Sequence, residues 1–377
     1  MLMMYKYLVN KLTLLLTDEC NLRCSYCFIH RNGANMDAQP PRRMTVKDKK
    51  KLTDMLLYQP GRRKSIEFFG GEPLLMFDEI REAITYARKA AQKAGKDVSF
   101  CMSTNGALLD RDKLSFLLAN GVSLSVSIDG TRACHDMNRK LLSGEGSSYD
   151  LALGGIPKEM RKDVTVNYVI SRNTCSCLAD GVRDLVEHGF DRINISPDMT
   201  VPWEGNELDA LGRSLEELSG YYMKLFGEGA AFTLMPIEMV AGLEEGLSRR
   251  CHNATADTSG RILTCKSMLS LADADRERLM TGSIKSGIDG NRRRQFIESS
   301  REKTARATAS VCGKCDIGRM CFCKVGAFAL SGCDEERFLK LFQTFCRISG
   351  MYIMSMKGLK DWMIATDPAQ YRRLYKR

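Results

Sequence analysis

Residues 12–27 read LTLLLTDECNLRCSYC, a short apolar run followed at once by three closely spaced cysteines. The run Leu12–Leu16 has the length and apolar character of a buried strand. In the loop after it, Cys20, Cys24 and Cys27 have the spacing Cys-x-x-x-Cys-x-x-Cys. Three thiolates on one loop can each hold one iron of a 4Fe–4S cube and leave the fourth iron open to a chelating substrate. A structural zinc is the alternative, and it needs a fourth ligand such as His30.

Composition narrows the class of protein. The chain has 377 residues, of which 44% are hydrophobic and 27% are charged, and its net charge of +10 favours acidic partners. No stretch reaches the roughly 18 to 20 apolar residues that span a bilayer, which predicts no membrane insertion. Polar residues interrupt the apolar N-terminus and no small-residue cleavage site follows, so we expect no export signal. In a reducing cytoplasm, clustered thiols among 15 cysteines more often bind metal than form disulfides.

Strand and helix patterns alternate through the first 200 residues. The strands are expected at Leu12–Leu16, Ser65–Phe69, Val98–Met102, Ser123–Ile128, Val164–Ile170 and Ile193–Ser196. Helices are expected at 45–58, 77–94, 110–119, 149–161 and 174–188. Six such units predict a parallel sheet, as an incomplete (β/α) barrel or a doubly wound sheet, with ligands at the carboxyl ends of the strands.

Three further motifs follow predicted strands. They are Gly70-Gly71-Glu72-Pro73, Ser103-Thr104-Asn105-Gly106 and Ser127-Ile128-Asp129-Gly130. Glycines at a strand end let a ligand approach the backbone, and Glu72 offers an acceptor for an ammonium group. Each motif alone is consistent with a capped turn, but motifs at four consecutive strand ends indicate a binding site.

These motifs together resemble the radical S-adenosylmethionine (SAM) superfamily over roughly residues 12–200. The resemblance implies a partial (β/α)6 TIM-like barrel in which Cys20, Cys24 and Cys27 hold a 4Fe–4S cluster and act as the catalytic cysteines. It implies that SAM is cleaved to a 5′-deoxyadenosyl radical that abstracts a hydrogen atom from the substrate. The SAM-binding residues it implies are Tyr26, Gly70, Gly71, Glu72, Pro73, Ser103, Asn105, Ser127, Asp129 and, within His135-Asp136-x-x-Arg139, Arg139.

The C-terminal cysteines are similar to the SPASM extension of radical SAM enzymes that modify peptides, which implies two auxiliary 4Fe–4S clusters. By position, Cys251 and Cys265 belong to the first, and Cys312, Cys315, Cys321 and Cys346 to the second. The family spacing Cys-x3-Cys is replaced by Cys321-x-Cys323, so Cys323 and Cys333 are uncertain ligands, assigned to the first cluster. Zinc sites remain an alternative. The expected regions are the barrel at 1–200, a helical bridge at 201–250, the SPASM domain at 251–350 and a basic helical tail at 351–377.

The resemblance predicts a cytoplasmic peptide maturase that installs a thioether or carbon–carbon crosslink on a ribosomally made precursor peptide. It also implies a reductant such as flavodoxin or ferredoxin, with no nucleic acid or membrane partner. Only 19 residues precede Cys20, so leader binding is expected at the surface, on a separate leader-binding protein, or not at all. The alternative is formylglycine formation, as in anaerobic sulfatase maturases, although Lys266 stands where that branch has an aspartate base. A small-molecule substrate ranks third, and a zinc protein that binds nucleic acid last.

A few other residues are open to two interpretations. Glu67 and Asp198 lie near strand ends, where they could contact substrate or form structural ion pairs. His252 beside a cluster cysteine could support that ligand or be one. We expect packing roles for Cys101, Cys134, Cys175 and Cys177.

Overall fold

A nine-stranded sheet is the centre of the fold in this computed structural model, which describes residues 8–29, 41–229, 232–244, 252–315, 317 and 323–375. Its strands are β1 (Lys11–Leu15), β3 (Arg63–Phe69), β4 (Asp97–Thr104), β5 (Val122–Ser127), β7 (Thr165–Ile170), β8 (Arg192–Pro197), β9 (Thr233–Leu234), β10 (Asn253–Ala256) and β11 (Ile262–Leu263). All six predicted strands are present, within a few residues of the expected bounds.

The strand order distinguishes between the two predicted architectures. The order is β11-β10-β1-β3-β4-β5-β7-β8-β9, and every neighbouring pair is parallel except β10 with β11. From β1 to β9 the strands follow one another in sequence order without the reversal of a doubly wound sheet, so the sheet is a partial barrel. On the other side of β1, β10 pairs in register from Lys11↔Asn253 to Leu14↔Ala256. The sheet therefore continues from the first 200 residues into the cysteine-rich region.

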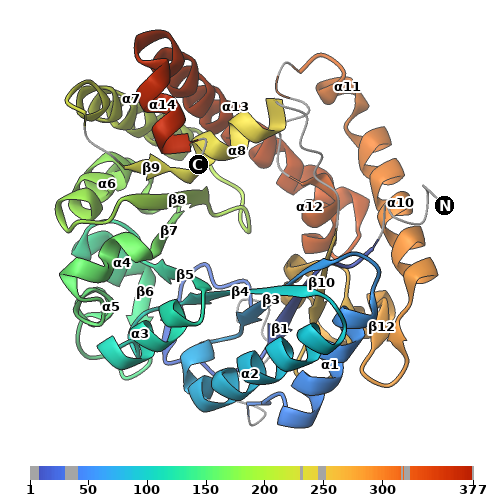
Figure 1. The fold of residues 1–377 in the computed structure, drawn as a ribbon. Coiled ribbons are helices and arrows are strands. Elements are labelled where there is room, and N and C mark those ends of the chain that lie inside the picture. The colour runs from blue at the N-terminus through green and yellow to red at the C-terminus, as the bar shows by residue number, and fades with distance from the viewer. Residues whose placement is uncertain are drawn as a thin grey trace.

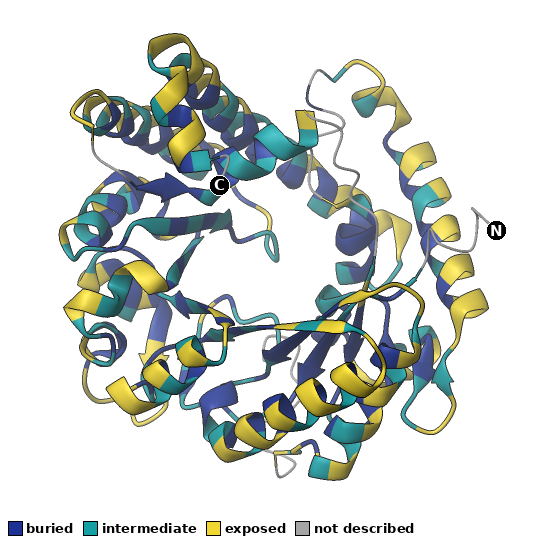
Figure 2. Ribbon diagram, viewed as in Figure 1, coloured by how far each residue is buried: buried dark blue, intermediate teal, exposed yellow. Residues whose placement is uncertain are grey.

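Helices cover the outer side of the strands, and their exposed faces point to solvent (Figures 1 and 2). They are α1 (Val46–Tyr58), α2 (Phe77–Lys93), α3 (Arg111–Ala119), α4 (Arg132–Asn138), α5 (Ser148–Gly154) and α6 (Leu178–Glu187). The first helix is capped by Thr45, whose side chain accepts from the backbone N–H of Asp48.

Two local features differ from the expectation. The helix expected at 149–161 is split into α5 and the 3-10 turn η3 (Lys158–Asp163), because Pro157 cannot continue a helix that begins before it. A small antiparallel ribbon, β2 (Leu22–Cys24) with β6 (Arg139–Leu141), and helix α4 were not predicted. They are too short for a periodic pattern to identify.

The C-terminal half is mostly helical. Its helices are α7 (Gly205–Gly227), α8 (Met235–Glu244), α9 (Asp273–Leu279), α10 (Gly290–Ala307), α11 (Ala309–Cys312), α12 (Lys324–Leu330), α13 (Glu335–Thr366) and α14 (Pro368–Tyr375), with the hairpin β12 (Gly282–Ser283) and β13 (Gly287–Ile288). Helix α13 packs against α7 and α8 and runs unbroken across the boundary expected at residue 350. Within the described ranges, no helix is long and apolar enough to cross a bilayer.

The two faces of the sheet differ in chemistry. Alternate strand residues such as Phe100, Leu124 and Tyr168 are buried in one apolar core with the helices. The intervening residues, which point to the opposite face, are mostly small and polar. On the central strands they are Ser103, Ser125, Ser127, Thr165, Asn167, Asn194 and Ser196. The inner face of the barrel can therefore bind a polar ligand.

Candidate active site at the carboxyl ends of the strands

The three cysteines of the first motif lie on the cysteine loop, residues 17–27, which leaves the carboxyl end of β1 and contains β2. Cys20 is buried, while Cys24 and Cys27 are partly buried. Burial raises the pKa of Cys20 to about 12 and that of Cys24 to about 11, although Arg139 opposes the latter shift. Without a metal these thiols therefore stay protonated at neutral pH, and a bound cluster would displace their protons.

The surroundings of the thiols fit a 4Fe–4S cluster, in which donors to the sulfur atoms are usual. The Leu22 backbone N–H points to Cys20 Sγ at 3.4 Å, and Asn105 Nδ2 lies 3.8 Å from the same sulfur. Arg139 Nη1 lies 3.8 Å from Cys24 Sγ. Among described residues, no three His, Cys, Asp or Glu side chains converge on one metal ion. A cube does not require such convergence, because each thiolate holds a different iron.

The Gly70–Pro73 turn is locked onto the cysteine loop. The Gly71 N–H donates to the Thr17 carbonyl at 2.9 Å, and the Glu72 N–H donates to that of Glu19 at 2.8 Å. A Cβ at Gly71 would lie 2.1 Å from the Glu19 carbonyl oxygen, and one at Gly70 would lie 2.8 Å from that of Thr17. These glycines were expected to admit a ligand, but the group that approaches them in the structure is the backbone of the cysteine loop.

Glu72 is completely buried and joins two strand ends. Its carboxylate accepts from the Leu74 N–H at 2.9 Å, the Thr104 hydroxyl at 2.7 Å and the Asn105 N–H at 2.8 Å. Burial raises the pKa of Glu72, while these donors oppose the shift. An ammonium acceptor role for Glu72 remains a prediction, and the contacts present hold the turn after β3 to the end of β4.

A buried network joins the cysteine loop to the end of β5. The Tyr26 hydroxyl donates to Asp129 Oδ2, and Arg139 Nε donates to the same oxygen at 3.0 Å. Asp129 Oδ1 accepts from the Val169 N–H at 3.0 Å. The Arg139 guanidinium also lies over the Tyr26 ring, 5.3 Å from its centroid. Burial lowers the pKa of Arg139, but Asp129, Tyr26 and Cys24 together outweigh it, so the pKa is raised and the guanidinium stays charged.

Two further residues of the His135–Arg139 segment belong to this network: His135, which the sequence motif contains, and Asn138, which was not singled out from the sequence. The Asp129 N–H donates to His135 Nδ1 at 3.2 Å, and the Ser25 hydroxyl donates to Asn138 Oδ1 at 3.0 Å. Burial lowers the pKa of His135 to about 4, so its ring is neutral. Their only sequence signal is their place beside Arg139 in the His-Asp-x-x-Arg segment.

Glu67, which the sequence left open to two interpretations, forms ion pairs with two lysines. Lys266 Nζ lies 3.0 Å from Glu67 Oε1, and Lys11 Nζ lies 3.2 Å from Oε2, which also accepts from Thr13. Burial would raise the pKa of Glu67, but Lys266 and Lys11 outweigh it and lower the pKa to about 2. Lys266 Nζ also lies 4.4 Å from the centre of the Phe69 ring. Of the two interpretations, these contacts favour the structural ion pair.

Asp198 and His252 have local partners. Asp198 Oδ1 accepts from the Thr200 N–H at 2.9 Å, as in a capped turn. His252 Nδ1 lies 2.9 Å from the Leu8 carbonyl. Cys175 donates to the Arg172 carbonyl, and Cys134 is buried beside Cys177, in keeping with the expected packing roles.

Only some of the cysteines predicted to bind auxiliary clusters lie near one another. Burial and then the neighbouring Cys323 raise the pKa of Cys265, where η5 (Lys266–Ser270) packs on α12. Cys333 lies beyond the other end of α12, which at about 1.5 Å per residue separates it from Cys323 by roughly 10 Å. Cys312, Cys333 and Cys346 pack against the same apolar cluster around Phe338 and Phe342. Cys251 and Cys321 lie outside the described residues.

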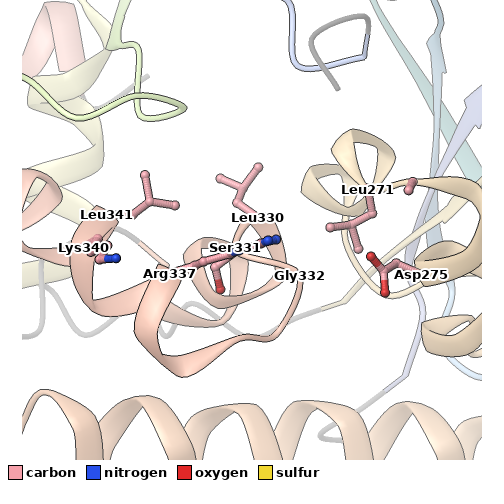
Figure 3. Close-up of a pocket in the computed structure, with 9 residues that line it drawn as sticks. Leu271, Asp275, Leu330, Ser331, Gly332, Arg337, Lys340 and Leu341 are labelled. Carbon is pink, nitrogen blue, oxygen red and sulfur yellow. The ribbon is translucent and has the colours of Figure 1, made fainter. Parts of the chain in front are cut away.

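A cavity of about 510 Å³ lies between the start of α9 and the α12–α13 turn (Figure 3). Its lining is mixed, and includes Leu271, Asp275, Leu330, Gly332, Arg337 and Leu341. It contains none of the predicted SAM-binding residues, so it is separate from the site at the strand ends.

Comparison with known families matches residues 14–145 to the radical SAM superfamily. The cysteine-type anaerobic sulfatase-maturating enzyme of Clostridium perfringens is 29% identical over 124 residues, 33% of this chain and 34% of that enzyme. The probable GTP 3′,8-cyclase of Methanococcus aeolicus is 30% identical over 177 residues, 46% of this chain and 54% of that one. The matches thus span about a third to a half of these relatives' length.

Solved structures resemble much more of the chain. The structure described as native anSMEcpe with bound AdoMet has a TM-score of 0.73 at 18% identity and covers 93% of this chain and 99% of that one. Streptococcus suis SuiB bound to its precursor peptide SuiA has a TM-score of 0.57 at 13% identity, over 85% and 73% of the two chains. At these identities the likeness confirms the fold, with the partial barrel and the region that follows it.

Proposed function

We propose, from the radical SAM domain that residues 14–145 form, that this chain cleaves SAM reductively and modifies a side chain of a peptide or protein. The observation that carries the proposal is the cysteine loop, whose thiols receive N–H donors and whose backbone is locked onto the Gly70–Pro73 turn. When bound, a 4Fe–4S cluster and SAM supply one electron and a hydrogen-abstracting radical.

The protein's own residues hold and orient these groups. Cys20, Cys24 and Cys27 would bind the cluster. SAM would lie over the strand ends, against Gly70–Pro73, Ser103, Asn105, Ser127 and Arg139. The polar inner face below would receive the substrate side chain and shield the radical from water.

A peptide or protein substrate is supported by the relatives. Two peptide complexes, SuiB with SuiA and anSMEcpe with the Cp18Cys peptide, share this fold over 85% and 93% of the chain. Within this class we propose a thioether or carbon–carbon crosslink as the product. Ring closure after hydrogen abstraction requires one more electron to leave, and auxiliary clusters at the C-terminal cysteines would give it a route.

Formylglycine formation is the second candidate, favoured by the sequence match to sulfatase-maturating enzymes. The contacts of Lys266 count against it. Lys266 stands after Cys265 where an aspartate base is expected, and its carboxylate partner Glu67, with its pKa lowered to about 2, is a poor base at neutral pH.

Mass spectrometry of the peptide product distinguishes these outcomes. The reconstituted enzyme is incubated anaerobically with SAM, dithionite and the peptides encoded beside its gene, with Cys20→Ala as the control. Loss of two hydrogens without reactivity toward a hydrazide indicates a crosslink, whereas a hydrazide-reactive product indicates formylglycine. Uptake of one solvent deuterium, with no mass change in ordinary water, indicates epimerisation. An unmodified peptide pool alongside 5′-deoxyadenosine formation would contradict a peptide substrate from this locus.

A further inference from the structure

The β2–β6 ribbon joins part of the cysteine loop to the segment after α4. Its register pairs Leu22↔Leu141, Arg23↔Lys140 and Cys24↔Arg139. Directly opposed residues share one face of a ribbon, and the face alternates along each strand. Cys24 and Arg139 therefore lie on the inner face, where Arg139 Nη1 approaches the Cys24 sulfur, while Arg23 and Lys140 lie together on the outer face.

The outer pair is unfavourable for the ribbon itself, because like charges directly opposite each other repel. Arg23 is partly exposed and donates to the carbonyls of Leu22 and Cys20, at 3.3 and 3.5 Å. Lys140 is exposed. Within the part of the chain that the structure describes, neither forms an ion pair. Two uncompensated cations on a short ribbon are thus available to an anionic partner.

Two exposed apolar residues lie close to Lys140 in the sequence. Met137, at the end of α4, and Leu142, directly after β6, are each 53% exposed. Leu142 is tied to the cysteine loop, since its N–H donates to the Asn21 carbonyl at 2.9 Å. A small patch with basic and apolar groups suits a transient protein contact, and electron-transfer encounters have the smallest interfaces.

The short separation between the outer face and Cys24 favours an electron donor as the partner. Only one layer of backbone separates the outer face from Cys24, so an electron donor seated there lies close to the cluster. We propose that the outer face of the β2–β6 ribbon docks an acidic one-electron carrier protein, which delivers its electron to the cluster through the Cys24 side. The inference rests on the proposed function. In each encounter the carrier loses one electron and the cluster gains one, with no bond made or broken.

Reduction kinetics test the proposal. The cluster-loaded enzyme is mixed with a reduced flavodoxin, and bleaching of the cluster absorbance is followed by stopped flow. Lys140→Glu should slow the reduction about tenfold at low ionic strength, and the difference should shrink in about 0.5 M salt. Lys89→Glu, on the exposed face of α2, makes the same charge change away from the ribbon and should reduce at the wild-type rate. Equal rates for wild type and Lys140→Glu, or equal slowing by Lys89→Glu, would overturn the proposal.

Cross-linking gives a readout without turnover. A carbodiimide joins a lysine ammonium to a carrier carboxylate as an amide, with the lost water taken up by the reagent as a urea. We expect the flavodoxin adduct at Lys140, mapped by mass spectrometry. An adduct only at lysines away from the ribbon would contradict the docking site.

Dithionite separates this proposal from the function on which it rests, because so small a reductant requires no docking. Lys140→Glu with dithionite should form 5′-deoxyadenosine at the wild-type rate and contain the same iron. If the wild type forms none with dithionite, both proposals fail. If Lys140→Glu instead weakens binding of the peptide substrate and leaves carrier reduction unchanged, the ribbon binds peptide and the carrier proposal fails.

Discussion

Arg139 Nε donates to Asp129 Oδ2 at 3.0 Å, and the two side chains are 7% and 0% exposed. A buried pair of this kind holds two elements together, because separating the two side chains would leave each charge buried without its counter-charge. Asp129 follows β5, while Arg139 begins β6 opposite Cys24. The pair therefore connects the central sheet to the ribbon that carries Cys24, one of the three proposed cluster ligands.

Replacing Asp129 should release this connection. Asp129→Asn leaves the buried Arg139 guanidinium without its counter-charge, which costs about 3 kcal/mol or more. We expect a lower apparent Tm and reduced iron content after reconstitution. Asp150→Asn, which breaks the exposed Arg132–Asp150 pair, is the control and should cost less than about 1 kcal/mol. An equal decrease in stability in Asp129→Asn and Asp150→Asn would contradict a special role for the buried pair.

The Gly71 position should tolerate no side chain. Gly71→Ala places a Cβ 2.1 Å from the Glu19 carbonyl oxygen, so the cysteine loop must move away from the Gly70–Pro73 turn. The expected result is loss of most cluster-bound iron, measured by iron analysis and absorbance near 400 nm. Gly154→Ala, with nothing within 4 Å of the new Cβ, should bind as much iron as the wild type. A fully loaded Gly71→Ala protein would show that the close approach is not needed.

His135 should make stability depend on pH. Burial lowers its pKa to about 4, against the ordinary 6.5, so below pH 6.5 the unfolded chain binds a proton that the folded chain does not. Stability is thus complete above pH 6.5 and falls toward pH 4, by about 1 kcal/mol at pH 5.5. Denaturant unfolding at pH 7.5 and 5.5 checks this, with His135→Gln expected to show a smaller difference. The same difference in both proteins would rule out His135 as the cause.

The C-terminal cysteines should contribute unequally to iron binding. Cys323 neighbours Cys265, whereas Cys333 lies at the far end of α12, so Cys323→Ala should lose the four irons of a cluster at Cys265 and Cys333→Ala should keep them. Iron analysis after identical reconstitution makes the comparison. Iron loss from Cys333→Ala alone would reverse the assignment.

The Glu67–Lys266 pair should couple the barrel to the region after it. Glu67→Gln leaves two lysines without their shared carboxylate and should lower stability by about 1 to 2 kcal/mol, since both lysines keep some access to water. In a double-mutant cycle with Lys266→Met, the two effects should be clearly less than additive. Additive effects would show that the pair is not energetically coupled.

Much of the barrel could be predicted from the sequence, because strands such as Val164–Ile170 are short, mostly apolar and rich in β-branched and aromatic residues. The ribbon and α4 could not, since three to seven residues carry no period and form only against the cysteine loop. At the site, Glu72 and Asp129 follow β3 and β5 as the motifs predicted, whereas Arg139 begins the unpredicted strand β6. Their hydrogen-bond partners depend on long-range packing, so the contacts of Asn138 and His135 became visible only in the structure.

The central claim is that the cysteine loop supports reductive cleavage of SAM. The most direct measurement is 5′-deoxyadenosine formation by the reconstituted enzyme with SAM and dithionite, quantified by mass spectrometry. We predict product from the wild type and from Cys177→Ala, whose cysteine lies outside the loop, and none from Cys24→Ala. Product from Cys24→Ala, or none from a wild type with a full complement of iron, would contradict the account.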